Sequence, residues 1–169
     1  LLAVRDPLTG LYNRRFFQKV VRREAVRSLR YEHPLFLFFF DIDHFKDYND
    51  QNGHQAGDLL LIQFAEVLKS SIREDVDTAF RYGGDEFTVL LPHLPKQQAA
   101  VVAERIQQKY GALVLSPTSL SVGAAEFVKN TGDIEADVED MIRRADAALY
   151  HVKHHLGGNE VSFDPRPTG

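Results

Sequence analysis

The sequence contains no cysteine and no tryptophan, and it has only one methionine. Without cysteine the chain can form no disulfide bond, which agrees with a reducing compartment. Its longest uninterrupted apolar run, residues 35–40, is too short to cross a bilayer, and the first residues do not form a signal peptide. We therefore expect a cytoplasmic domain without direct membrane contact.

The sequence also lacks an excess of positively charged residues. The formal net charge is −4, which argues against nucleic acid as a partner. Arginines are concentrated in residues 14–30, where they fit a solvated helix face better than a nucleic-acid contact. The 169 residues, 44% of them hydrophobic, suit one domain. Because the sequence begins with Leu-Leu-Ala, we expect a piece of a longer protein, whose upstream sensor domain or membrane anchor lies outside it.

Hydrophobic periodicity predicts an α+β domain with a mostly antiparallel central sheet flanked by helices. We expect helices at about 13–31, 44–51, 55–72, 96–110 and 135–155. We expect strands at about 35–41, 76–82, 86–91, 112–115, 118–126 and 161–163.

The segment 80–91 is the most informative part of the chain, because it predicts two short strands joined by a tight turn. The adjacent glycines Gly83 and Gly84 are expected to supply the positive φ angles of that turn. Asp85 and Glu86 follow directly, and an ordinary hairpin tip does not need two acids there. This acidic pair requires a functional explanation.

A second acidic position follows the apolar run 35–40, which is typical of a strand buried on both faces. If that strand lies beside the hairpin, Asp41 and Asp85 meet at one edge of the sheet. A bound cation is the simplest way to keep two such carboxylates ionised. Oxygen ligands without histidine or cysteine favour Mg²⁺ or Mn²⁺.

Residues 83–87 spell Gly-Gly-Asp-Glu-Phe, the signature of the GGDEF family of diguanylate cyclases. Further segments that resemble family motifs occur in family order, at residues 6–15, 41–50, 53–58, 119–123 and 144–150. The resemblance implies the ferredoxin-like palm fold of nucleotidyl cyclases. It also implies a division into the end of an upstream linker or signalling helix at 1–5, a GGDEF domain at 6–163 and a C-terminal tail at 164–169.

The family reaction condenses two GTP molecules into cyclic di-GMP and two pyrophosphates, across a homodimer with two Mg²⁺ or Mn²⁺ ions per active site. Two alternatives stay open. One is a degenerate GGDEF module that binds GTP or a protein partner without chemistry. The other is a mixed cyclic GMP-AMP synthase, although relatives of that kind carry serine where this sequence has Asp58.

The resemblance assigns metal binding to Asp41, the Ile42 carbonyl, Asp85 and Glu86. It assigns catalysis to Asp85, Glu86 and Lys153. Glu86 fits a metal ligand and a general base equally well. Asp43, which lies where a helix is expected to begin, is instead interpreted as a helix cap.

Substrate binding is assigned to Asn49 and Asp58 for guanine, because a carboxamide and a carboxylate match its edge. The alternatives are a helix-end residue for Asn49 and a helix cap for Asp58. The amide groups around Phe45 and Lys46, together with Lys153, are expected to hold the phosphates.

Two departures from the family pattern stand out. The family's phosphate-binding arginine is replaced by Gly158 after a one-residue insertion, and we hypothesise that protonated His154 or His155 takes its place. The family's inhibitory product site reads Arg-x-x-Asp, whereas this chain has Glu74 and Asp77 in that register. We expect this site to be degenerate, because a carboxylate cannot replace a guanidinium.

Overall fold

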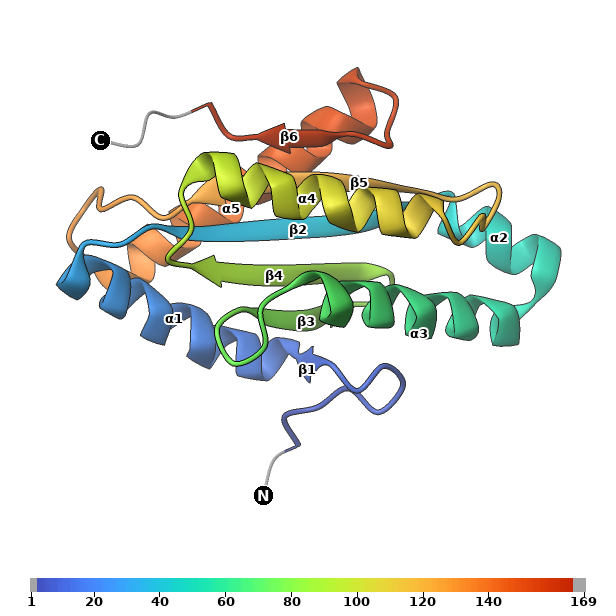
Figure 1. Cartoon of the computed structure of the whole chain (residues 1–169), viewed down its shortest axis with the longest axis horizontal. Coiled ribbons are helices and arrows are strands. Elements are labelled where there is room, and N and C mark those ends of the chain that lie inside the picture. Colours follow the sequence, from blue (N-terminus) through green and yellow to red (C-terminus); the bar gives the residue numbers. More distant parts are fainter. Residues whose placement is uncertain (1–2, 166–169) are drawn as a thin grey trace.

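The computed structural model describes residues 3–165 of the chain as one sheet covered by helices (Figure 1). The elements in chain order are β1 (Tyr12–Asn13), α1 (Arg14–Tyr31), β2 (Leu35–Asp43), α2 (Phe45–Asn52), α3 (His54–Ser71), β3 (Thr78–Gly83), β4 (Glu86–Pro92), α4 (Lys96–Gly111), β5 (Ser119–Glu126), α5 (Ile134–His155) and β6 (Val161–Phe163).

The sheet has six strands in the order β1-β3-β4-β2-β5-β6. β2 is central and pairs antiparallel with β4 and β5, and β3 pairs antiparallel with β4. Only the two edge pairs, β1 with β3 and β5 with β6, are parallel. The predicted α+β class with a mostly antiparallel sheet is therefore confirmed.

Two hydrophobic layers enclose the sheet, one on each face. α3 and α4 cover one face and α1 and α5 cover the other (Figure 1). β2 is buried on both sides because its side chains alternate between these layers: Phe38 and Phe40 face α3 and α4, whereas Phe39 faces α1 and α5. This explains why its sequence is continuously apolar.

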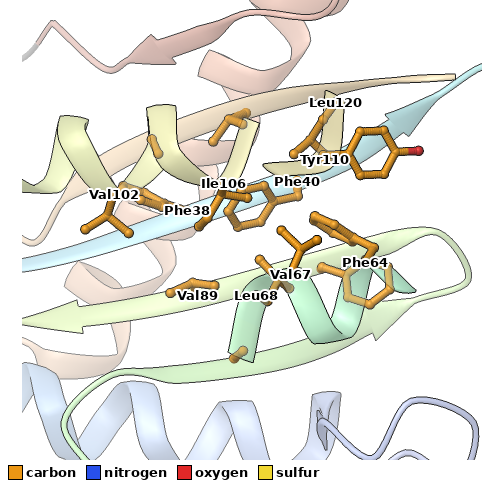
Figure 2. Packing of buried hydrophobic residues seen from close by; sticks show 14 of the residues in the cluster. Phe38, Phe40, Phe64, Val67, Leu68, Val89, Val102, Ile106, Tyr110 and Leu120 are labelled. Atoms are coloured by element: carbon orange, nitrogen blue, oxygen red, sulfur yellow. The ribbon is translucent and has the colours of Figure 1, made fainter. Parts of the chain in front are cut away.

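Aromatic rings fill the layer beneath α3 and α4 (Figure 2). The ring of Phe64 meets those of Phe87 and Tyr110 edge-on, with centroid separations of 4.8 and 5.5 Å. Phe40 packs against Phe64 in the same way at 5.7 Å. Full burial of such a side chain contributes roughly 1.5–3 kcal/mol, so this cluster holds α3 and the central strands in one rigid unit.

One strand was not expected, and three local expectations were wrong. Residues 12 and 13 form the parallel edge strand β1, which is too short to give a periodic signal. Residues 112–115 form turns and coil. Gly83 and Gly84 have no positive φ, because the register shifts between Arg81 and Gly83 and the turn closes without one. Asp43 is the last residue of β2 and not a cap, since α2 begins after His44.

The chain segments next to the domain are also docked on it. Arg5 forms a β-bridge with Tyr12, and the amide of Asp164 donates to the Ala124 carbonyl. The rest of the expected linker and tail, residues 1–2 and 166–169, lies outside the described residues. None of the helices within residues 3–165 combines the length and the hydropathy that a membrane span requires.

Candidate active site

Three acids lie on neighbouring strands at the end of the sheet where β2 stops and the β3–β4 hairpin turns. Asp41 lies opposite Glu86 in the antiparallel register of β2 and β4. Asp85 occupies the turn between β3 and β4. Burial, the charge of Asp41 and a hydrogen bond shared with Asp41 together raise the pKa of Asp85 to about 6. The structure thus brings the carboxyl groups of residues 41 and 85 into direct contact.

Lys153 of α5 approaches the same carboxylates from the α1 and α5 face. Its Nζ donates a hydrogen bond to Oδ2 of Asp41. Partial burial lowers the pKa of Lys153, but the bond to Asp41 and the charges of Asp41, Asp43 and Asp85 outweigh burial and raise it. The ammonium group is therefore a fixed positive charge within the acidic cluster.

The donor set at this edge fits a hard divalent ion that keeps several open positions. Asp41 and Asp85 offer carboxylate oxygens, and the charge repulsion between them favours a cation. Within residues 3–165, no three His, Cys, Asp or Glu side chains converge closely enough to enclose a metal. An ion bound here would complete its shell with backbone oxygen, water and substrate phosphate, as Mg²⁺ usually does.

α2 starts directly after the acidic strand end. The amides of Phe45 and Lys46 open this helix, and no side chain caps its first turn. Such amides, with the positive end of the helix dipole, can hold an anion. The predicted phosphate contacts therefore lie next to Asp41 and Lys153 along one end of the fold.

Asn49 and Asp58 lie on α2 and α3, which are joined at Gly53. The Oδ1 atom of Asn49 is buried and has no hydrogen-bond partner within the described residues. Asp58 is exposed in the body of α3, so its interpretation as a helix cap was wrong. Asn49 likewise lies inside α2 and not at its terminus.

Asp43 has a role that the sequence did not reveal. Its buried carboxylate accepts hydrogen bonds from the hydroxyls of Ser119 and Ser121, at 2.7 and 2.8 Å, and from the amide of Asn159 at 3.1 Å. These bonds tie the turn between α5 and β6 to the sheet. The available signal was the alternation that puts Asp43 on the same face of β2 as Asp41, together with the Ser-x-Ser spacing of β5.

Gly158 belongs to this turn and has a positive φ of 81°. A Cβ atom at Gly158 would lie 3.0 Å from Oδ2 of Asp43. A side chain at the position that corresponds to the family arginine would therefore be strained and would press on the Asp43 carboxylate. His154 stacks on the ring of Tyr150 at 4.1 Å, and His155 stacks on His151 at 5.3 Å, all four on the last turns of α5.

The expected inhibitory position is occupied by an internal ion pair. Arg73 donates to Oδ1 of Asp77 at 2.6 Å and to Oδ2 at 3.0 Å, and its Nη2 also donates to the Pro92 carbonyl. The Asp77 side chain is almost fully buried. Glu74 lines, together with Arg73 and Asp77, a cavity of about 670 Å³ between α1 and the start of β3.

Comparison with known proteins gives consistent results. The family model described as diguanylate cyclase, GGDEF domain, matches residues 3–159. The diguanylate cyclase DosC of Escherichia coli K12 is 36% identical over 165 residues; the match covers 94% of this chain and 34% of DosC. The chain thus spans about a third of that relative's length.

Solved structures agree with this result. The GGDEF domain of DgcB from Caulobacter crescentus, solved in complex with c-di-GMP, superposes with a TM-score of 0.87 at 30% identity, covering 98% of each chain. The diguanylate cyclase SiaD of Pseudomonas aeruginosa, solved with its activator SiaC, has a TM-score of 0.82 at 35% identity; the match covers 95% of this chain and 62% of SiaD. With its palm-like six-stranded fold and its family match over nearly its whole length, this chain belongs to the GGDEF domain family of diguanylate cyclases.

Proposed function

We propose that this chain is the catalytic domain of a diguanylate cyclase, which condenses two GTP molecules into cyclic di-GMP and two pyrophosphates. The observation that carries the proposal is the cluster of Asp41, Asp85 and Lys153 beside the uncapped start of α2. Two acids and one cation beside a helix start suit nucleotidyl transfer, because they can bind divalent ions and phosphate oxygens. DosC carries the name of this activity, and DgcB was solved with its product.

In this proposal Asp41, the Ile42 carbonyl, Asp85 and Glu86 would hold two Mg²⁺ or Mn²⁺ ions. A divalent ion, when bound, would supply Lewis acidity and offset the charge of the triphosphate. Glu86 is exposed at the start of β4, where its carboxylate can serve as a ligand or accept a proton. Both roles stay open for Glu86.

The protein's own groups then position the reactants. Lys153 and the amides of Phe45 and Lys46 hold phosphate oxygens, while Asn49 and Asp58 hold guanine. The ribose hydroxyl of one nucleotide attacks the α-phosphorus of the other, and the bond from that phosphorus to pyrophosphate breaks. The hydroxyl proton passes to a carboxylate or to water.

One domain carries one set of these groups, so two domains must face each other for two such transfers. We therefore propose a homodimer as the catalytic unit, controlled by an upstream sensor domain in a cytoplasmic setting. The domain limits of 6–163, with a linker before and a tail after, belong to this proposal. SiaD, solved with its activator SiaC, shows that a relative also assembles with a protein partner.

The competing function is a GGDEF module that binds GTP or a protein without chemistry. Gly158 favours it, because glycine replaces the arginine that usually binds phosphate there and the backbone at this position disfavours a side chain. A mixed cyclic GMP-AMP synthase is the remaining candidate, which the carboxylate of Asp58 disfavours.

One experiment separates the three functions. Concentrated protein is incubated with Mg²⁺ and GTP, with and without ATP, and the products are identified by mass spectrometry. We expect cyclic di-GMP alone, at a rate that rises more than linearly with protein concentration. GTP binding without any cyclic product would identify the degenerate module, and a mixed product would identify the synthase.

A further inference from the structure

Gly57 lies in α3 directly against the carboxamide of Asn49 in α2. A Cβ atom built on Gly57 would lie 1.6 Å from Oδ1 of Asn49, 2.7 Å from its Cγ and 3.2 Å from its Nδ2. Real Cβ atoms do not approach other atoms to 1.6 Å. The carboxamide therefore occupies the space that any other residue at position 57 would fill.

The backbone of Gly57 gives no other reason for glycine. Its φ is not positive, and it lies within α3, where its amide donates to the Gly53 carbonyl at 3.2 Å. Glycine inside a helix costs roughly 0.5–1 kcal/mol relative to alanine. The sequence accepts this cost at a buried position, where the three nearest atoms that an added Cβ would meet all belong to the side chain of Asn49.

The contact is also what fixes the orientation of the carboxamide. Oδ1 of Asn49 is buried without a hydrogen-bond donor within residues 3–165, so no hydrogen bond to this oxygen holds it. A buried acceptor without a partner costs about 1–3 kcal/mol. The carboxamide oxygen is therefore held here by packing against Gly57, and a longer residue at position 57 would displace it.

We propose that Gly57 is a positioning residue for guanine recognition. Because Gly57 has no side chain, it leaves a space on α3 for the carboxamide of Asn49, which we call the Asn49 socket. The inference rests on the proposed function, in which Asn49 and the neighbouring Asp58 hold the base. The socket places the carboxamide beside the carboxylate, so that one group donates to the guanine carbonyl and the other accepts from its N–H groups. Removal of the socket should weaken GTP binding while the helix itself gains stability.

The test compares Gly57→Ala with Gly111→Ala, a matched change at the end of α4 where an added Cβ meets nothing within 4 Å. Affinities for ATP and for a GTP analogue with a non-cleavable α–β linkage are measured by calorimetry with Mg²⁺. We expect Gly57→Ala to lower the affinity for the GTP analogue about tenfold, which corresponds to about 1.4 kcal/mol, with little change for ATP. Gly111→Ala should match the unmodified protein.

A double-mutant cycle with Asn49→Ala shows whether Gly57 acts through Asn49. In the Asn49→Ala background, Gly57→Ala should have no further effect on the affinity. An equal tenfold loss in both backgrounds, an unchanged affinity in Gly57→Ala, or unfolding of Gly57→Ala alone would each overturn the proposal. If the unmodified protein does not prefer GTP over ATP, the proposed function itself fails, whatever the variants do.

Discussion

Lys153 of α5 donates a hydrogen bond to Asp41 at the end of β2, across 112 residues of sequence. The pair joins the last helix of the domain to the edge of the sheet where the acids of the hairpin lie. Asp41 is in turn in contact with Asp85. The carboxyl groups of Asp41 and Asp85 thus share one ammonium group, that of Lys153. When both carboxyl groups are ionised, these three side chains together carry a net negative charge.

The excess charge predicts that Asp85→Asn stabilises the protein in the absence of divalent ions. The raised pKa of Asp85, about 6, means that its ionised form is unfavourable in the folded state at pH 7. After allowance for solvent screening, we expect a gain of about 1–2 kcal/mol in the free energy of unfolding. Urea denaturation with a chelator checks this. Cyclase activity should be lost in the same variant, and a destabilised Asp85→Asn would contradict the account.

The pH dependence of stability should include a contribution from Asp6. Burial acts to raise its pKa, but hydrogen bonds from Thr9 and the charge of Arg81 outweigh burial and lower it. A depressed pKa in the folded state stabilises the protein above the unfolded value near 3.8, and this contribution disappears as the pH falls through the folded value.

Asp6→Asn should therefore lower the free energy of unfolding by about 1 kcal/mol at pH 7. The difference from the unmodified protein should shrink toward zero below pH 4. Denaturation curves at several pH values measure it. Because Arg81 also donates to the Gly84 carbonyl at 2.9 Å, we expect lower cyclase activity in this variant. If the stability difference between Asp6→Asn and the unmodified protein grew as the pH fell, the prediction would be contradicted.

Asp43 should be important for stability although it is not a cap. Asp43→Ala leaves the hydroxyls of Ser119 and Ser121 without their acceptor and the amide of Asn159 with only the Ser121 oxygen, and we expect a loss of about 2–4 kcal/mol. Ser119→Ala removes one of these bonds and should cost about 1 kcal/mol. Chemical denaturation of both variants gives the comparison. Equally small losses of stability in Asp43→Ala and Ser119→Ala would show that other contacts hold the turn after α5.

Restoring the family arginine by Gly158→Arg should not improve nucleotide binding. The positive φ of 81° and the Asp43 oxygen 3.0 Å from a new Cβ both oppose a side chain there. We expect a loss of about 1–3 kcal/mol in stability and no gain in GTP affinity. Deletion of Leu156 combined with Gly158→Arg restores the family spacing and is the variant expected to bind GTP more tightly. Tighter GTP binding by Gly158→Arg alone would contradict this prediction.

Product inhibition should be absent or weak. Asp77 already accepts two hydrogen bonds from the Arg73 side chain and one from the Arg73 amide, so its carboxylate is not available to hold guanine, and Glu74 repels phosphate. Calorimetry with cyclic di-GMP should detect no binding that depends on Asp77. Binding that disappears in Asp77→Ala, while Glu74→Ala leaves it intact, would show a working inhibitory site.

The sequence alone was sufficient to predict the elements with strong hydrophobic periodicity and the acidic end of β2. A strand that is apolar on both faces, an acidic hairpin and long amphipathic helices are local properties of the chain, whereas the register between β2 and β4 is a contact between distant segments. The sequence misjudged features that depend on a neighbour. The turn at Gly83 and Gly84 closes by a register shift with β4, and β1 exists only because β3 offers its edge.

The candidate site shows the same difference between features that the sequence predicts and features that depend on packing. The identities of Asp41, Asp85 and Lys153 could be proposed from motifs, but their contact depends on how α5 packs on the sheet. Likewise, only packing shows that Asn49 fills the space above Gly57 and that Asp43 binds the turn at Asn159. The sequence by itself determined which groups are available, because alternation and helix period are properties of one segment. Their pairing was decided by the tertiary structure, because contacts between distant segments exist only after the helices have packed on the sheet.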